Sequence, residues 1–267
     1  MDFSSVPSSP KQPRLRVFAG PNGSGKSTII EVVKAFTHNG KPVDLGYYIN
    51  ADEIAASLRK GDFSFAAYDL SFSIDAFTLF AQASGLLSDE FSADDLAKAY
   101  SVDNAGQVKL ETPAVDERLA QLLARFLREE LLRHGKRFSF ETVFSHESNL
   151  DIMRRAAAAG YKVYLYFVAT ESPEINKYRV ALRVLKGGHN VDPVKIEQRY
   201  YRALELLSEA VPLCHRTYFY DNSKDRIADI AWEPLVAQVS TTNGEQEFEQ
   251  VGDSLPKWVE TYYLKKL

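Results

Sequence analysis

A glycine-rich stretch near the start of the chain has residue types and a spacing that suit phosphate chemistry. Gly20, Gly25, Lys26 and Ser27 fit the pattern G-x-x-x-x-G-K-[ST]. Glycines let the backbone curl so that successive N–H groups point at phosphate oxygens. The lysine adds one positive charge, and the serine hydroxyl after it can ligate Mg²⁺. The pattern therefore predicts a P-loop, also called a Walker A motif, that binds the phosphates of ATP.

The residues around this stretch predict the strand–turn–helix unit that a P-loop requires. Residues 15–19 are apolar apart from Arg16 and predict a buried strand, and apolar residues with helical spacing follow Lys26. The start of this helix would add its positive dipole end to the phosphate site. The predicted nucleotide-binding residues are Gly20, Pro21, Asn22, Gly23, Ser24, Gly25, Lys26, Ser27 and Thr28. Ser27 is also the predicted metal ligand.

Acidic and amide side chains follow the next two predicted strands. Asn50 ends one strand and Asp52 comes just after it, while Glu141 lies near the end of the third strand, 136–144. Ligands of open α/β sheets bind at this edge. Asp52 could accept a hydroxyl proton as a catalytic base, with helix capping as the structural alternative. Glu141 and Asn50 are the predicted substrate-binding residues, with a solvated strand end as the alternative for Glu141.

Two predicted helices within 173–210 carry arginines that suit a lid. Arg179 and Arg183 are four residues apart and therefore lie on one face of the first helix. A glycine pair separates it from the second helix, which carries Arg199 and Arg202. Such a lid would supply positive charge to the phosphates when it closes. The alternative is a solvated basic face that neighbouring glutamates balance.

Two other classes of P-loop protein leave signatures that this sequence lacks. The stretch LKGGH resembles part of the L-S-G-G-Q signature of transport-type ATPases, but no strand ending in Asp-Glu follows it. The guanine-reading pattern N-K-x-D is approached at Asn176 and Lys177, but its fourth position is Arg179. The sequence therefore favours a small-molecule kinase.

Strands alternate with helices along the chain, which predicts an α/β fold. We expect a P-loop NTPase or kinase-like parallel sheet flanked by helices, with a helical insertion and a C-terminal β-hairpin. The hairpin prediction comes from Asn243-Gly244, which lies between two β-like runs. No strand pattern is apparent between Gly61 and Thr112. The expected parts are a flexible arm (1–12), a kinase core (13–225) with an insertion (60–135) and lid helices (173–210), and a C-terminal hairpin and helix (226–267).

The composition limits the choice of partners and compartment. The chain has 267 residues, a net charge of −4 and one cysteine, Cys214, so no intrachain disulfide is expected. The acidic balance argues against a nucleic-acid partner and gives no attraction to a membrane surface. No apolar run is long enough to span a bilayer, and the N-terminus lacks the apolar core of a signal peptide. These features predict a cytoplasmic protein with a small-molecule acceptor.

Four stretches in order resemble motifs of the zeta toxin family of P-loop kinases, in its broad bacterial branch. They are GPNGSGKST, YINADEIA, FSFETVFS and RVALRVLKGGHNVDPVKIEQRYYRALELL, and the similarity covers residues 16–223. The resemblance implies an ATP- and Mg²⁺-dependent kinase with a parallel-sheet core. Characterised zeta toxins phosphorylate the 3′-hydroxyl of UDP-N-acetylglucosamine and are held inactive by a small helical antitoxin. A similar antitoxin partner is therefore implied for this chain.

The resemblance also assigns roles by motif position. Lys26 corresponds to the P-loop lysine, Asp52 to the catalytic base and Glu141 to the acid of the third strand. Arg179 and Arg183 fall where lid arginines are expected, which completes the predicted catalytic set of Asp52, Lys26, Arg179 and Arg183. One departure is that family members commonly carry an arginine shortly after the Glu-Thr pair, whereas the run here is ETVFSHESN.

The sequence thus predicts an ATP-dependent transferase that phosphorylates a hydroxyl of a small acceptor, with UDP-N-acetylglucosamine or another nucleotide sugar as a candidate. Two alternatives remain. One is a non-catalytic nucleotide-binding protein that acts through a partner. The other is a nucleic-acid 5′-end kinase, which would need a basic track for its substrate.

Overall fold

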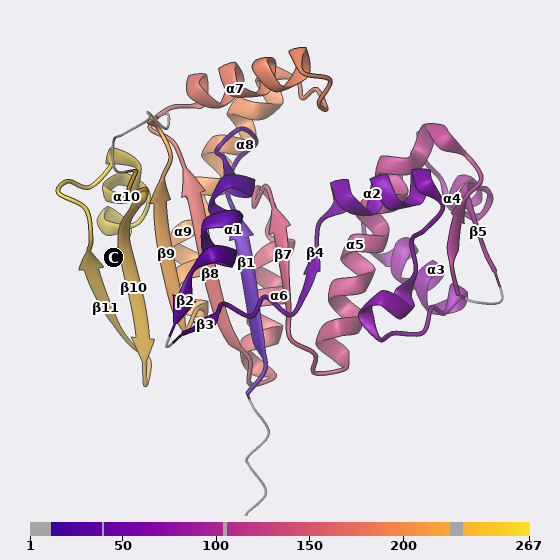
Figure 1. Ribbon diagram of the computed structural model, residues 1–267, viewed down its shortest axis with the longest axis horizontal. Helices are drawn as coiled ribbons and strands as arrows, with labels where there is room; N and C mark the ends of the chain where they lie inside the picture. The colour runs from indigo at the N-terminus through magenta and orange to yellow at the C-terminus, as the bar shows by residue number, and fades with distance from the viewer. Residues whose placement is uncertain (1–11, 39, 104–105, 225–231) are drawn as a thin grey trace, which may run out of the picture. The chain divides into compact units, whose positions relative to one another are not determined.

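The computed structural model describes residues 12–38, 40–103, 106–224 and 232–267, so the predicted arm falls almost wholly outside the described residues (Figure 1). The chain divides into two compact units. The first comprises Met1–Val43 and Thr142–Leu267, and the second comprises Asp44–Glu141. Each unit contributes strands and helices of its own.

The first unit contains strands from both ends of the chain. Its strands are β1 (Arg14–Ala19), β2 (Thr37–His38), β3 (Lys41–Pro42), β8 (Lys162–Ala169), β9 (Arg216–Asp221), β10 (Leu235–Thr242) and β11 (Glu245–Gln250). Its helices are α1 (Lys26–Ala35), α6 (Ser148–Ala158), α7 (Pro173–Leu185), α8 (Pro193–Glu205), α9 (Leu207–Ala210) and α10 (Lys257–Tyr262). The lid helices predicted between residues 173 and 210 are therefore α7, α8 and the short α9.

The main sheet is mostly parallel. β8 pairs in parallel with β1 and with β9, whereas β10 runs antiparallel to β9 and to β11. Within the first unit the strand order is β11-β10-β9-β8-β1. Asn243 and Gly244 turn from β10 to β11 with φ angles of 54° and 85°, which suits a two-residue hairpin. The structure confirms the predicted α/β fold and the C-terminal hairpin.

Helices cover both faces of the first unit's sheet. In Figure 1, α1 lies in front of the strands, while α6, α8 and α9 lie behind them. The indole of Trp258 on α10 packs against Phe167 and Phe219 and donates a hydrogen bond to Asp221 Oδ2 at 2.8 Å. Phe167 and Phe219 are fully buried, so the parallel strands have the apolar character expected for a covered sheet.

The second unit contains the predicted helical insertion, residues 60–135, with β4 before it and β7 after it in the chain. Its strands are β4 (Tyr47–Ile49), β5 (Tyr100–Val102), β6 (Val108–Leu110) and β7 (Phe138–Thr142, the last residue of which belongs to the first unit). Its helices are α2 (Ala51–Lys60), α3 (Ile74–Ala83), α4 (Ala93–Ala99) and α5 (Asp116–Arg133). β4 and β7 pair in parallel. Phe65, Phe77 and Phe126 form part of an aromatic core.

The expectation that residues 61–112 contain no strand was wrong. β5 and β6 form an antiparallel pair that joins Tyr100 to Leu110 and Val102 to Val108. Each strand has only three residues, which is too few positions for an alternating pattern to be recognised. The pair adds a short hairpin to an otherwise helical unit.

Two smaller predictions can be compared with the described residues. None of the helices there is both long enough and apolar enough to cross a bilayer. Cys214 is buried, as expected for a small apolar group. Its burial raises the pKa of the thiol to about 12.

Candidate functional site

The glycine-rich loop joins β1 to α1 in the first unit. β1 ends at Ala19 and α1 begins at Lys26. Gly20, Gly23 and Gly25 have φ angles of 148°, 77° and 89°, in the region that L-residues rarely adopt. Gly25 is also the residue that precedes the first turn of α1. The loop backbone therefore curls as the P-loop pattern predicts, and it ends at a helix N-terminus.

Close neighbours make glycine necessary at all three positions, including Gly23, where a Cβ atom would lie 2.5 Å from the carbonyl oxygen of Asn176. A Cβ atom at Gly20 would lie 2.0 Å from the carbonyl oxygen of Val168. A Cβ atom at Gly25 would lie 2.0 Å from the side-chain nitrogen of Asn222. All three distances are far below van der Waals contact, so the loop can keep this path only without side chains here.

Two asparagines that the sequence analysis did not assign hold the loop. Asn176 Nδ2 donates to the carbonyl of Asn22 at 2.7 Å, and Asn222 Nδ2 donates to the carbonyl of Ser24 at 2.8 Å. Asn176 is fully buried and also contacts the Thr170 hydroxyl through its Oδ1. Asn222 directly follows β9, so a polar residue after a parallel strand was the available signal.

Lys26 and Ser27 lie at the helix end of the loop. The buried Lys26 ammonium donates to the carbonyls of Gly20 at 2.8 Å and Pro21 at 3.2 Å, which keeps the charge within the curl of the loop. Ser27 is exposed at the start of α1. Within the described ranges, no group of three or more His, Cys, Asp or Glu side chains could hold a metal ion. This loop suits a metal site in which the Ser27 hydroxyl and the phosphates of a bound nucleotide coordinate the ion.

The arginines of the lid helices do not all reach the loop. Arg179 donates to the carbonyl of Asn222 at 2.6 Å, and Arg183 donates to the carbonyl of His189 at 2.9 Å, within the glycine hinge. Arg199 on α8 contacts the loop, with its Nη1 3.4 Å from Asn22 Oδ1. The sequence placed Arg199 on the second lid helix but left it out of the predicted site.

In the second unit, Asn50 and Asp52 have different roles at the start of α2. Asn50 is the N-cap, and its Oδ1 accepts a hydrogen bond from the Asp52 N–H at 2.8 Å. The structural alternative for Asp52 was that it caps this helix, and the cap is instead Asn50. The Asp52 side chain is exposed in the first turn of α2, where a carboxylate interacts favourably with the helix dipole.

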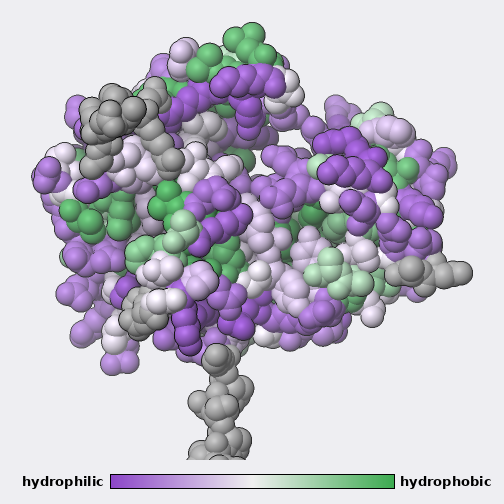
Figure 2. All heavy atoms as spheres, in the orientation of Figure 1, coloured by the Kyte–Doolittle hydropathy of each residue, from purple (hydrophilic) through white to green (hydrophobic). Residues whose placement is uncertain are grey.

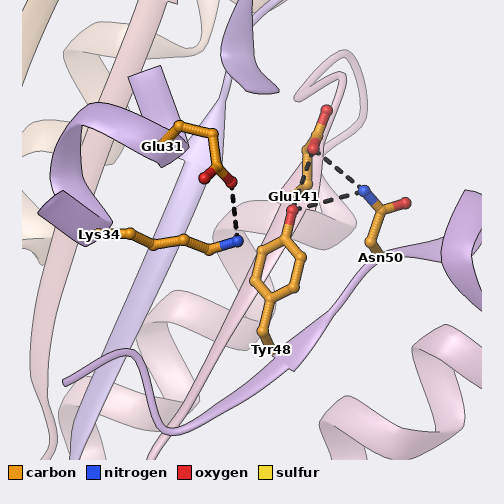
Figure 3. A network of polar contacts seen from close by, with 5 residues as sticks. All are labelled: Glu31, Lys34, Tyr48, Asn50 and Glu141. Atoms are coloured by element: carbon orange, nitrogen blue, oxygen red, sulfur yellow. Dashed lines mark hydrogen bonds and ion pairs between the residues drawn. The ribbon is translucent and has the colours of Figure 1, made fainter. Parts of the chain in front are cut away.

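Glu141 joins Asn50 and Tyr48 in one polar network, drawn in Figure 3. Its Oε2 accepts hydrogen bonds from the Tyr48 hydroxyl and from Asn50 Nδ2, both at 3.2 Å. Burial and the nearby Glu141 carboxylate raise the pKa of Tyr48, so this phenol remains a hydrogen-bond donor at neutral pH. The predicted substrate-binding pair of Glu141 and Asn50 is thus in contact, together with a tyrosine that the sequence analysis did not assign.

The predicted site residues therefore form two groups. The loop residues, Arg179 and Arg183 belong to the first unit, whereas Asn50, Asp52 and Glu141 belong to the second. The predicted catalytic set, which includes both Lys26 and Asp52, therefore draws on both units, and it stays a prediction.

The fold and the loop together define the class as an α/β protein with a strand–P-loop–helix unit. The sequence matches no family model and no curated protein. Solved structures are similar at low identity, and the likeness is one of fold. A chain from the PezAT chromosomal toxin–antitoxin system of the human pathogen Streptococcus pneumoniae is 17% identical, with a TM-score of 0.46 over 80% of this chain and 70% of that one.

A second similar structure is that of AvrRxo1-ORF1:-ORF2 with ATP. The matched chain is also 17% identical, with a TM-score of 0.46 over 89% of this chain. This chain spans 61% of that chain's length. At this sequence identity and TM-score, the similarity assigns no function to the chain.

Proposed function

We propose that the protein is an ATP- and Mg²⁺-dependent kinase that transfers a phosphoryl group to a hydroxyl of a small acceptor. The observation that carries the proposal is the loop of residues 20–28, with its left-handed glycines, its inward lysine and its two asparagine braces. A nucleotide sugar such as UDP-N-acetylglucosamine is the first acceptor to test, because of the resemblance to the zeta toxin motifs.

The loop has the features that a triphosphate requires. Its amides and the N-terminus of α1 would bind the phosphate oxygens, and Lys26 would neutralise charge on the β- and γ-phosphates. The exposed Ser27 hydroxyl would hold Mg²⁺, which would supply further positive charge to the phosphates. Backbone donors and one fixed cation fit this role because phosphoryl transfer is catalysed by positioning the phosphates and by stabilising the charge that develops on their oxygens.

Asp52 is the proposed base for the acceptor. Its carboxylate would accept the hydroxyl proton while the acceptor oxygen bonds to the γ-phosphorus and the bond to the ADP oxygen breaks. Glu141 and Asn50 would hold other polar groups of the acceptor. Arg179 and Arg183 would neutralise charge on the phosphoryl group when the lid closes. The proposal requires the second unit to present Asp52 to the loop of the first.

The decisive experiment measures transfer from γ-labelled ATP to a panel of sugar nucleotides, nucleosides and cell extract. Asp52→Asn should bind ATP nearly as well as the unmodified protein but lose about 100-fold or more in turnover, which is the usual contribution of a general base. Lys26→Ala should weaken ATP binding and lower turnover. Asp62→Asn changes an exposed carboxylate just after α2, the helix that carries Asp52, and should alter neither ATP binding nor turnover. A near-normal rate for Asp52→Asn would remove this residue from the mechanism.

The same assay distinguishes the two alternatives. Tight ATP binding without transfer to any pool would favour a non-catalytic nucleotide-binding protein. Label on the 5′ ends of nucleic acid in the extract would favour an end kinase. The first result would leave the loop's role intact and overturn only the proposed reaction.

A protein partner similar to an antitoxin is part of the proposal, because of the family resemblance. The outer face of α7 supports it, since Tyr178, Leu182 and Leu185 are exposed there, and Figure 2 shows apolar residues gathered over this helix at the top of the view. Exposed apolar patches of this kind mark protein-binding surfaces. We expect expression of the chain alone to arrest bacterial growth and Asp52→Ala to relieve the arrest; harmless expression of the unmodified chain would contradict a toxic role.

A further inference from the structure

The segment at the end of β9, residues 221–223, connects the C-terminal part of the first unit to the phosphate loop. Asn222 in this segment is buried, and its Nδ2 donates to the carbonyl of Ser24 at 2.8 Å. Its backbone N–H donates to the carbonyl of Ala169, the last residue of β8, at 2.9 Å. The position of segment 221–223 therefore determines whether the loop keeps this brace.

Asp221 holds this segment through both oxygens of its carboxylate. Oδ1 accepts a hydrogen bond from the Ser223 N–H at 2.9 Å, and Oδ2 accepts one from the indole N–H of Trp258 at 2.8 Å. The Ser223 hydroxyl oxygen accepts in turn from the N–H of Glu171 at 2.8 Å. Hydrogen bonds to an ionised carboxylate are about twice as strong as those between neutral groups, so Asp221 fixes the path of the backbone on either side of Asn222.

The tryptophan that donates to Asp221 has little freedom to move away. Trp258 is 3% exposed, and its ring centroid lies 5.8 Å from that of Phe167 and 6.1 Å from that of Phe219. Because protein interiors are close-packed, the indole cannot shift without opening a void between these rings. α10 therefore presents the indole N–H at a fixed point beside the end of β9.

The backbone of the C-terminal hairpin reaches the same strand end. The Asp221 N–H donates to the carbonyl of Pro234 at 2.8 Å. The pairing of β10 with β9 then shifts at a β-bulge between Leu235 and Ala237. Bulges are common beside functional sites, where they change the direction of a strand. The hairpin and α10 thus hold β9 at the residue that precedes Asn222.

We propose that Trp258 and Asp221 are positioning residues of the nucleotide site. They keep Asn222 within hydrogen-bond distance of the Ser24 carbonyl, and through this contact they keep the loop amides directed toward the phosphates. The inference rests on the proposed function, since it concerns the ATP site of that kinase, and it extends this site to residues 232–267, beyond the stretches that resemble the zeta toxin motifs. A purely structural anchor would stabilise the fold and leave the ATP affinity of the folded protein unchanged.

The test measures the affinity of a fluorescent, non-hydrolysable ATP analogue with Mg²⁺ for the full chain and its variants. Trp258→Phe keeps an aromatic ring against Phe167 and Phe219 but removes the N–H donor. It should weaken binding about fivefold or more, which is part of the loss expected for a hydrogen bond to a charged group. Asp221→Asn, which retains the shape of the side chain but not its charge, should weaken binding by a similar factor.

A double-mutant cycle tests the route through Asn222. Asn222→Ala should weaken binding of the ATP analogue about tenfold or more, because it removes the brace itself. Trp258→Phe should cause no further loss in the Asn222→Ala background, since two changes that act through one contact are not additive. An anchor with no role in the loop would not show this dependence.

Val259→Ala is the matched control for a loss of stability. Val259 is fully buried on the same helix as Trp258, so the variant should lower the midpoint of urea unfolding at least as far as Trp258→Phe does. It should leave the affinity for the ATP analogue unchanged, because the hydrogen bonds of Asp221 remain.

Each outcome decides the proposal. Unchanged affinity for the ATP analogue in either Trp258→Phe or Asp221→Asn overturns it, and so does an equal loss of affinity in Val259→Ala. A further loss from Trp258→Phe in the Asn222→Ala background also overturns it, because the effect would then bypass the brace. If Trp258→Phe fails to fold by circular dichroism, Asp221→Asn alone and combined with Asn222→Ala gives the answer.

Failure of this inference and failure of the kinase proposal are separable, because binding measures the first and phosphoryl transfer measures the second. Weaker binding in Trp258→Phe, without any transfer by the unmodified protein, would keep the positioning role and remove the kinase. Transfer by the unmodified protein, with an unchanged KM for ATP in Trp258→Phe, would keep the kinase and remove the positioning role.

Discussion

Replacement of Gly25 by alanine tests whether the loop shape is built for phosphate. Gly25 has a φ angle of 89°, and a Cβ atom there would lie 2.0 Å from Asn222 Nδ2. The substitution therefore has two separate effects. It strains the backbone, and it pushes away the asparagine that donates to the Ser24 carbonyl.

The two effects have different sizes and can be separated. A left-handed backbone costs an L-residue about 1–2 kcal/mol relative to its preferred conformation. Loss of the buried contact between Asn222 and Ser24 adds about 1–2 kcal/mol. Gly25→Ala should thus reduce the free energy of unfolding by about 2–4 kcal/mol. Gly160→Ala is the matched control, because Gly160 has a φ angle of 81° and nothing within 4 Å of a Cβ atom, so only the backbone strain applies.

Urea unfolding gives the stability of both variants, and titration with a fluorescent ATP analogue gives their affinity. We expect Gly160→Ala to lose only the strain contribution and to bind nucleotide normally. Gly25→Ala should bind nucleotide at least tenfold more weakly, since the amides on either side of it would turn away. Equal ATP affinity for the two variants would refute the assignment of this loop as the phosphate site.

Three further predictions concern residues elsewhere in the chain. Arg199→Ala removes the arginine of α8 that contacts the loop and should lower turnover about tenfold or more. Arg202 is exposed on the same helix, so Arg202→Ala should leave turnover unchanged. Steady-state kinetics of the two variants will test this difference. Tyr48→Phe deletes a hydrogen bond to Glu141 and should raise the KM for the acceptor while leaving that for ATP unchanged. The pKa of Cys214, raised from 9.0 to about 12 by burial, means that the folded state holds this proton more tightly than the unfolded chain. The stability that the thiol provides is therefore complete below pH 9 and lost as the pH rises toward 12, so Cys214→Ala should show a smaller fall in its urea midpoint between pH 9 and 11 than the unmodified protein.

Local sequence patterns predicted those parts of the fold that depend on residues close together in the chain. The loop was recognisable because its glycines and lysine sit within nine residues of one another. The hairpin was recognisable because Asn-Gly favours a two-residue turn. The strands β5 and β6 were missed because three residues carry almost no periodicity, and their pairing depends on contacts with the rest of the second unit.

The two asparagines that hold the loop were not predictable because they are far from it in the sequence. Asn176 is 154 residues from its partner Asn22, and Asn222 is 198 residues from Ser24. No local sequence pattern around an asparagine predicts such a contact. The same holds for Trp258, whose indole N–H donates to a carboxylate 37 residues away, at Asp221.

The asparagine braces also restrict the way in which the proposed lid, α7 and α8, would move. Asn176 near the start of α7 holds the loop at Asn22, and Arg199 of α8 contacts the same residue. A rigid-body rotation of both helices would break these contacts and release the loop that they hold. Motion of the proposed lid should therefore be easiest in the part farthest from the loop, around Gly187, where Arg183 donates a hydrogen bond to the carbonyl of His189. On this reasoning Arg199 has its charge in place before any closure, while Arg183 is the arginine whose contribution depends on movement of the hinge.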